Sequence, residues 1–206
     1  GGPASRRSSA PPGPFGGLTH PAAADLCSLL ARIAHGSLPH MFLNDSGSVA
    51  VEILAKSGYH VVAITGKPEE RAYLTSLGAK EVLDRRGIDL TKIRPLDKAT
   101  WAGAVDNLGG DLLAWLLSTM KVGGMVGAVG LAADMKLNTT VAPFILRGVG
   151  LLGADSANTP MPLRQKVWNK LAVEWRPDVV HDQVRTIDFD ELPTHFDAYL
   201  KGMVRG

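Results

Sequence analysis

Cysteine is almost absent from this sequence, since Cys27 is the only one among 206 residues. A single thiol excludes an internal disulfide framework and any zinc site built from several thiolates, and it fits a reducing compartment. An excess of one charge is also missing, because 22 basic side chains are balanced by 20 acidic ones. Proteins that bind nucleic acid normally present a concentrated positive face. Nucleic acid is therefore not an expected partner.

Long apolar runs are missing as well. The richest apolar stretch, Leu112 to Met120, is far shorter than the roughly 20 residues that cross a bilayer. We therefore expect no membrane span and a cytoplasmic protein. With 45% hydrophobic and 20% charged residues, the chain has an ordinary globular composition that suits one domain with appendages.

The first 45 residues differ in composition from the rest. Residues 1–20 are crowded with Gly, Pro and Ser, contain Arg6 and Arg7, and include no acidic side chain. Such a segment buries too little apolar surface to fold, so residues 1–45 are predicted to form an atypical, largely disordered leader with one amphipathic helix over 22–34. Segments rich in Arg and Ser and poor in acids are also typical of transit peptides. An organellar location therefore stays open beside the cytoplasmic one.

From Ser48 onward, helix-length amphipathic segments alternate with short runs of valine, isoleucine and alanine. This alternation predicts βαβ units, and hence an α/β fold with a Rossmann-like doubly wound parallel sheet over residues 46–176. The predicted strands are 60–65, 81–83, 103–106, 125–130 and 150–153. The predicted helices are 48–56, 68–77, 111–120, 143–147 and 162–175. The remaining segment, 177–206, is predicted to add a strand at 184–189 and a helix at 191–200.

The end of the strand at 60–65 suggests a cofactor. In doubly wound sheets, the residue that ends the second strand meets the adenosine ribose about 20 residues after the glycine motif. Enzymes that choose NAD place an acid there, but this chain has Thr65, Gly66, Lys67 and then Arg71. A hydroxyl, a backbone amide and two cations suit a 2′-phosphate, so NADP(H) is favoured. The alternative is a solvated turn in which the two cations only keep the helix soluble.

The preceding turn departs from the dinucleotide-binding pattern. That pattern requires a strand, several glycines and a helix start whose free N–H groups hold the pyrophosphate. Here Asn44, Asp45 and Ser46 precede Gly47, which is the only glycine of the expected set, and the segment LPHMFL is a poor strand. An aspartate at this turn also repels a pyrophosphate. The sheet is therefore predicted to be incomplete at its first strand.

Several strings resemble one family. GSVAVEILAKSGYHVVAITGKPEERAYLTSLGAKEVLD, WAGAVDNLGG, KVGGMVGAVGLA, NTTVAPFILRGVGLLGADS and RQKVWNKL are similar to the acrylyl-CoA reductase, quinone-oxidoreductase-like branch of the zinc-free medium-chain dehydrogenase/reductase superfamily. The resemblance covers roughly Gly47 to Met203. It implies an oxidoreductase that transfers a hydride from NADPH to an α,β-unsaturated acyl thioester such as acrylyl-CoA, or to a quinone-like enone, within a homodimer.

The resemblance also implies where NADP(H) would be contacted. It assigns Ser46, Gly47 and Ser48 to the pyrophosphate turn and Thr65, Gly66 and Lys67 to the 2′-phosphate. Near the nicotinamide it implies Leu131, Ile145 and Ser156. The family's N-terminal catalytic domain has no counterpart in this sequence, so we expect a truncated form in which 177–206 is a remnant of that domain.

Other chemistry has little support in the sequence. The six histidines show no metal-ligand spacing beside a second ligand type, so no metal is expected. Hydride transfer depends on the cofactor, which is consistent with the lack of a recognisable triad, and no catalytic residue is assigned. Asp106 and Asn107 are predicted either to cap a helix or to contact the cofactor ribose. Lys136 and Arg147 are interpreted as solvated cations rather than as acyl-CoA ligands. Two further hypotheses stay open: a catalytically inactive fragment, and a non-catalytic nucleotide-binding, dimerising module.

Overall fold

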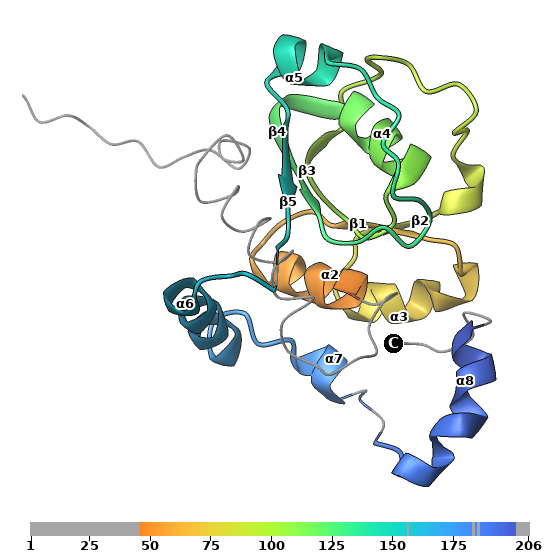
Figure 1. The fold of residues 1–206 in the computed structure, drawn as a ribbon, viewed down its shortest axis with the longest axis vertical. Helices are drawn as coiled ribbons and strands as arrows, with labels where there is room; N and C mark the ends of the chain where they lie inside the picture. Colours follow the sequence, from red (N-terminus) through yellow and green to blue (C-terminus); the bar gives the residue numbers. More distant parts are fainter. Residues whose placement is uncertain (1–45, 156, 183, 185, 201–206) are drawn as a thin grey trace, which may run out of the picture.

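The computed structural model describes residues 46–155, 157–182, 184 and 186–200, which form an α/β fold (Figure 1). The predicted leader 1–45 lies outside the described residues. No helix in the described part of the chain is long and apolar enough to cross a bilayer. The strands are β1 (Val62–Thr65), β2 (Glu81–Asp84), β3 (Trp101–Asp106), β4 (Met120–Ala128) and β5 (Gly150–Gly153). The α-helices are α2 (Ser46–Lys56), α3 (Arg71–Ser76), α4 (Gly110–Ser118), α5 (Ala142–Arg147), α6 (Met161–Ala172), α7 (Asp178–Asp182) and α8 (Leu192–Leu200).

The strands form two parallel half-sheets. β1 pairs with β2, and separately β3, β4 and β5 pair in that order. Within the described residues, no ladder joins β1 to β3. In a doubly wound sheet of order 3-2-1-4-5-6, the first strand fills that position. The segment LPHMFL, where the sequence predicts only a poor first strand, lies outside the described residues, so this part of the prediction stays a prediction.

Helix α2 connects the two half-sheets. Val51 belongs to the cluster around Val61, Val82 and Leu74, which lies over β1 and β2. Two residues later, Ile53 is fully buried in a second cluster, where Val105 of β3 also packs. That second cluster also contains Val167, Leu171 and Trp175, which belong to α6 and the segment after it. One amphipathic helix therefore buries its two apolar faces against different parts of the molecule.

Arg147, at the end of α5, anchors the three-stranded half. Its Nη1 donates to the carbonyl oxygens of Ser118 and Met120, both at 2.9 Å, and its Nη2 donates to the carbonyl of Asp97. Ser118 ends α4 and Met120 begins β4, so one guanidinium fixes α5 to the connection between them. The predicted solvated cation at position 147 is therefore a structural contact. The same half-sheet contains a third apolar cluster, made of Leu113, Leu117, Met120, Val126 and Val149.

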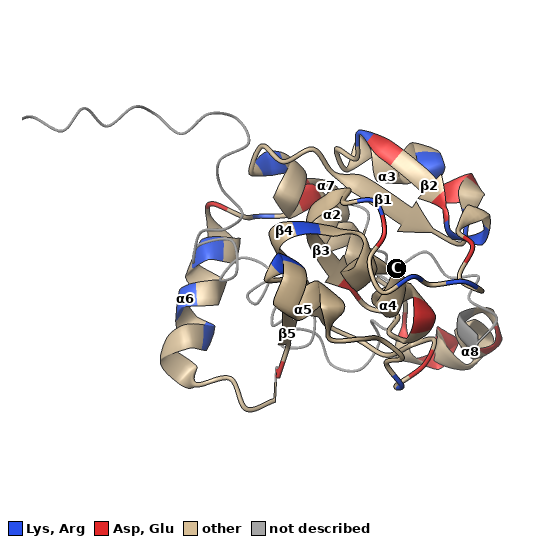
Figure 2. Cartoon of the chain, turned by 90° about the horizontal axis from the view of Figure 1, so that it is seen from above, with Lys and Arg blue, Asp and Glu red and all other residues tan. Residues whose placement is uncertain are grey.

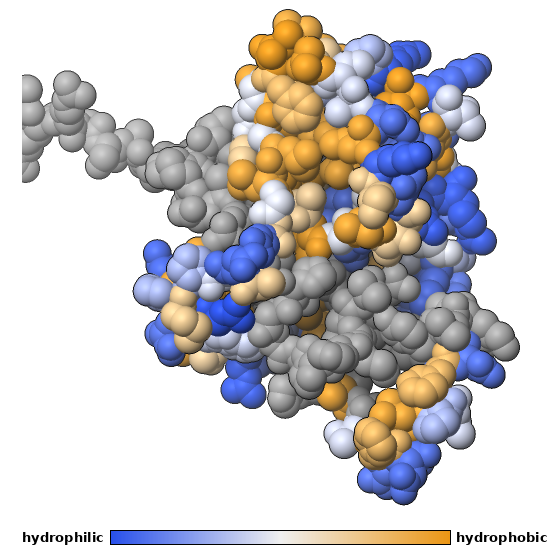
Figure 3. Space-filling model, viewed as in Figure 1, coloured by the Kyte–Doolittle hydropathy of each residue, from blue (hydrophilic) through white to orange (hydrophobic). Residues whose placement is uncertain are grey.

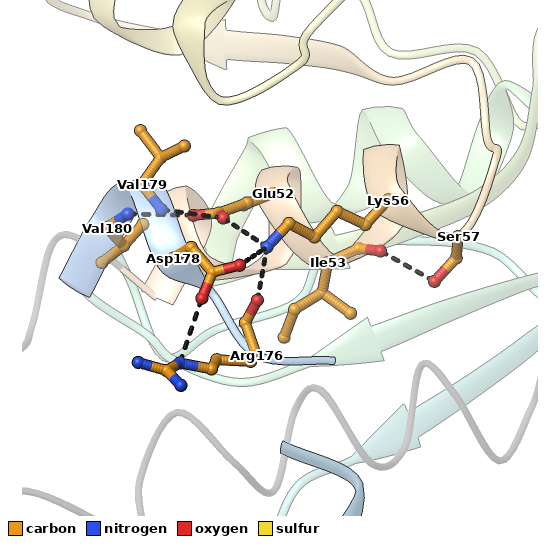
Figure 4. A network of polar contacts seen from close by, with 8 residues as sticks. All are labelled: Glu52, Ile53, Lys56, Ser57, Arg176, Asp178, Val179 and Val180. Carbon is orange, nitrogen blue, oxygen red and sulfur yellow. Dashed lines mark hydrogen bonds and ion pairs between the residues drawn. The ribbon is translucent and has the colours of Figure 1, made fainter. Parts of the chain in front are cut away.

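A polar network attaches α7 to α2 (Figure 4). Glu52 is 1% exposed, and its two carboxylate oxygens accept the backbone N–H groups of Val179 and Val180, each at 2.9 Å. Lys56 Nζ contacts Glu52 Oε1 at 3.0 Å and Asp178 Oδ2 at 2.8 Å. A buried carboxylate thus satisfies free amides at the start of α7 while its own charge is paired.

The predicted strand at 184–189 is wrong. Val184 and Thr186 to Asp188 have no regular structure, and Phe189 begins a short 3-10 helix that leads into α8. A strand needs a neighbour for its backbone groups, and no strand among the described residues pairs with this segment. The apolar, β-branched composition of the segment was therefore a misleading signal. The final helix forms close to its predicted bounds.

Candidate cofactor-binding edge

The carboxyl ends of β1 to β4 lie at one edge, where ligands bind to open parallel sheets. Thr65 at the end of β1 pairs in register with Asp84 at the end of β2. In the other half-sheet, Asp106 at the end of β3 pairs with Ala128 at the end of β4. We call this edge the candidate site.

The turn after β1 is shaped by its own hydroxyl. Thr65 Oγ1 accepts the backbone N–H of Lys67 at 3.0 Å. The Lys67 amide is therefore engaged within the turn and does not face a ligand. The hydroxyl hydrogen of Thr65 remains a potential donor to an anion, since its one hydrogen bond to a described residue, with the Lys67 carbonyl, is long at 3.5 Å.

Arg85 is a site residue that the sequence reasoning missed. Its guanidinium lies against Gly66, because a Cβ built on that glycine would stand 3.1 Å from Arg85 Nη2. Arg85 follows β2, and the parallel pairing of β2 with β1 brings it beside the turn at Thr65. A signal was available in principle, since neighbouring strands of a βαβ unit end at the same edge. We call Lys67, Arg71 and Arg85 the cationic corner.

Acidic side chains also lie at this corner, and Figure 2 shows basic and acidic segments alternating around α3 and β2. The Asp84 carboxylate is bound by Arg86, with Nη2 at 2.8 Å from Oδ2. The pKa of Asp84 is lowered chiefly by hydrogen bonds from Arg86, with a smaller Coulombic contribution from Arg71. The acid closest in register to Thr65 is therefore ionised and paired.

The start of α2 offers the second part of the site. The first turn of this 11-residue helix contains no acidic residue, and Asp45, which directly precedes it, lies outside the described residues. Gly47 lies close to Asn107, since a Cβ built on Gly47 would be 3.7 Å from Asn107 Nδ2. Ser48 is buried. Free N–H groups at a helix start suit a phosphate. Gly47 is the one glycine at this helix start, so a phosphate can approach the backbone closely only there.

The turn after β3 is held by a buried carboxylate. Asp106 is 2% exposed and accepts the N–H groups of Gly109 at 2.8 Å and Leu108 at 3.4 Å. Burial raises the pKa of Asp106, while the two backbone hydrogen bonds act in the opposite direction. Of the two predicted roles, the structural one fits this inward-facing side chain.

Backbone hydrogen bonds join that turn to the loop after β4. Val129 N donates to Asp106 O at 2.7 Å, and Ala133 N donates to Leu108 O at 2.8 Å. Gly109 has φ of 71°, and a Cβ at this position would lie 2.3 Å from Asp134 O. These contacts fix the loop after β4 against the turn after β3. Leu131 lies in this loop with 61% of its surface exposed.

Not all predicted contacts lie together. Ile145 is on α5, which Arg147 anchors to Met120, the first residue of β4, so it lies near the amino ends of the strands. Its side chain is 72% exposed. The structure does not bring Ile145 to the edge that Thr65 and Leu131 share. Ser156 lies outside the described residues, and the side chain of Ser46 is likewise not described.

The described residues contain no group of three or more His, Cys, Asp or Glu side chains that could hold a metal ion.

Comparison with known proteins identifies the family. Residues 47–175 match the family described as zinc-binding dehydrogenase. The chain is 46% identical over 160 residues to acrylyl-CoA reductase AcuI of Ruegeria pomeroyi, a match that covers 78% of this chain and 48% of the relative. A separate similarity of 52% over 42 residues links the chain to an adenosylmethionine-8-amino-7-oxononanoate aminotransferase of Buchnera aphidicola, covering 20% of this chain and 10% of that protein.

Two solved structures share the fold. Escherichia coli K-12 YhdH with bound NADPH is 41% identical, with a TM-score of 0.73, over 78% of this chain and 49% of YhdH. Bacillus subtilis YhfP with NAD bound is 36% identical, with a TM-score of 0.76, over 89% of this chain and 59% of YhfP. The chain thus spans about half the length of the curated relatives it matches. It belongs to the zinc-binding dehydrogenase family of the medium-chain dehydrogenase/reductase superfamily, and within that family it is similar to acrylyl-CoA reductases and a quinone oxidoreductase.

Proposed function

We propose that the carboxyl edge of this chain binds NADP(H), with the cationic corner as the receptor for the 2′-phosphate. The observation that carries the proposal is the Arg85 guanidinium against Gly66, in a turn that also contains Lys67 and where NAD-specific proteins place an acid. Ionised donors bind phosphate oxygens more strongly than neutral ones. One solved relative holds NADPH and another NAD, so the preference depends on this chain's own residues.

The remaining contacts follow from the same placement. The start of α2 at Ser46, Gly47 and Ser48 would hold the pyrophosphate through backbone N–H groups. Leu131 would lie near the nicotinamide, held by the loop that bonds to the turn after β3. Ser156, which lies outside the described residues, completes the proposed set, whereas Ile145 is left out of it because α5 is anchored near the amino ends of the strands.

The proposed reaction is the reduction of an α,β-unsaturated acyl thioester similar to acrylyl-CoA, or of a quinone-like enone. The names of the relatives support this class of substrate. NADPH, when bound, would supply the hydride, and this chain's residues would bind and orient the cofactor.

The second candidate is a non-catalytic nucleotide-binding, dimerising module, or an inactive fragment. The sequence of the turn before α2 favours it, because Gly47 is the only glycine of the set that a dinucleotide-binding turn normally contains. A chain with a binding corner but an incomplete glycine motif would retain the nucleotide without aligning its nicotinamide.

We further propose that a second copy covers β5. This strand pairs only with β4 among the described residues, so one row of its backbone groups has no ladder. Figure 3 shows apolar side chains gathered over α5 and the neighbouring strands, and Val122, Ile145 and Leu146 are each more than 60% exposed. Light scattering of the purified chain tests this. A dimer is expected, and a monomer at high concentration would contradict it.

Two assays separate the candidate functions. Fluorescence titration with NADPH measures binding, and NADPH oxidation with acrylyl-CoA measures turnover. Binding with turnover supports the reductase. Binding without turnover supports the non-catalytic module, and absence of binding contradicts both and leaves the inactive fragment.

A further inference from the structure

A carboxylate stands beside the proposed 2′-phosphate receptor. Asp84 ends β2 in register with Thr65, and neighbouring strands are about 4.8 Å apart. An acid at the ribose position is what disfavours a 2′-phosphate in NAD-specific sheets. In NAD-specific proteins that acid ends the strand equivalent to β1. Asp84 instead ends the next strand, β2, but its charge lies at the same edge of the sheet. Left unpaired, it would repel a phosphate at Thr65–Gly66–Lys67.

Arg86 neutralises this carboxylate. Its Nε lies 3.0 Å from Asp84 Oδ1, and its Nη2 lies 2.8 Å from Oδ2, so the guanidinium binds both oxygens. The backbone N–H of Arg86 also donates to Oδ1 at 2.9 Å. The same contacts lower the pKa of Asp84 and raise the pKa of Arg86, so both groups are charged at neutral pH. A bidentate arginine–carboxylate pair is stronger and more specific in geometry than a single contact.

The two adjacent arginines therefore have different partners. Arg86 binds Asp84, whereas Arg85 lies over Gly66, and no hydrogen bond or ion pair with another described residue engages its guanidinium. Without Arg86, the Asp84 carboxylate would be free to draw Arg85 or Arg71 away from the receptor. Arg71 is already close enough to lower the pKa of Asp84.

We propose that Arg86 determines the preference for NADPH over NADH, by binding Asp84 so that this carboxylate neither repels the 2′-phosphate nor competes for Arg85. This inference rests on the proposed binding of NADP(H). Asp84 also caps the short 3-10 helix Arg85–Gly87, and that local role depends on the backbone N–H of Arg86. The backbone bond persists when the Arg86 side chain is changed, which makes the two roles separable.

The experiment measures the dissociation constants of NADPH and NADH for the full chain and three variants. Arg86→Gln should weaken NADPH binding by about fivefold, because the unpaired Asp84 carboxylate repels a phosphate bound beside it, and should change NADH binding by less than about twofold. Asp84→Asn combined with Arg86→Gln should recover NADPH binding to within about twofold of the original chain. Arg94→Gln removes another exposed arginine, which pairs with Asp97 at 3.9 Å, and serves as the matched control.

Each outcome decides one question. If the original chain prefers NADPH and Arg86→Gln leaves the ratio unchanged, or weakens both cofactors equally, the role of Arg86 is contradicted while the proposed function stands. Failure of the double variant to recover NADPH binding contradicts the role assigned to Asp84. If the original chain binds neither cofactor, the proposed function fails and the inference fails with it. Circular dichroism of each variant checks that these exposed substitutions leave the fold intact.

Discussion

The two half-sheets end at the same edge but are built differently there. The end of the β1–β2 half consists of charged side chains, with Arg85 and Arg86 placed on different partners and Arg71 exposed to solvent. At the end of the β3–β4–β5 half, the contacts are mainly between backbone groups. The buried Asp106 and the close-packed glycines hold the turn after β3 against the loop after β4. Changes in the first half should therefore alter recognition, and changes in the second should alter stability.

The largest effect is expected at Gly109. Gly109→Ala would place a Cβ 2.3 Å from Asp134 O in a backbone with φ of 71°, so both a clash and strain arise. We expect a loss of about 3 kcal/mol in the free energy of unfolding, measured by urea denaturation. Gly87→Ala, where nothing lies within 4 Å, is the matched control in the other half and should be nearly neutral. Equal effects at the two glycines would contradict the comparison.

Arg147→Met is expected to have the next largest effect. The change leaves the carbonyls of Ser118, Met120 and Asp97 without their charged donor. A loss of about 2 kcal/mol in stability should follow, measured as the shift of the urea midpoint. Lys121→Met, at an exposed position of the same half-sheet, supplies the control. A stable Arg147→Met variant would show that α5 does not depend on this contact.

Glu52→Gln tests the contact that joins α2 to α7. The neutral amide loses the ion pair with Lys56 and leaves one backbone N–H of α7 without an acceptor. Stability should fall by about 1.5 kcal/mol. Hydrogen exchange should quicken at the amides of Val179 and Val180 while those of β4 stay protected, whereas exposed Glu174→Gln should change neither. Unchanged exchange at Val179 would rule out the capping role.

The smallest effect on stability, but a clear effect on recognition, is expected for Lys67→Ala. Removal of this cation should weaken NADPH binding by about tenfold and leave NADH binding and the urea midpoint nearly unchanged. Lys80→Ala removes an exposed lysine just before β2, at the opposite end of the strand, and should leave the NADPH preference intact. A similar loss in both variants would indicate a general charge effect rather than a receptor.

Local patterns predicted most of this fold. Short apolar runs became β1 to β5, and Pro68 and Gly78 correctly marked the two ends of the helical segment after β1, which begins as a 3-10 turn. Contacts between residues that are distant in the sequence could not be predicted from these local patterns. The segment 184–189 has the composition of a strand but no neighbour to pair with, and α7 depends on Glu52, which lies 127 residues away from Val179.

The candidate site shows the same division. Thr65, Gly66 and Lys67 were predicted because a single strand end and the spacing to Gly47 suffice to place them. Arg85 and the Asp84–Arg86 pair were missed because their relevance depends on the register between β1 and β2. Asp106 could be placed at the edge from sequence, but only its burial distinguishes a structural carboxylate from a ribose ligand.

The cationic corner is tested most directly by comparing NADPH with NADH in the original chain and in Arg85→Ala. Fluorescence titration should show tighter binding of NADPH than of NADH by the original chain, and a loss of about tenfold in that preference when the guanidinium over Gly66 is removed. Equal affinity for the two cofactors in the original chain, or an unchanged preference in Arg85→Ala, would contradict the assignment of this edge as a 2′-phosphate receptor.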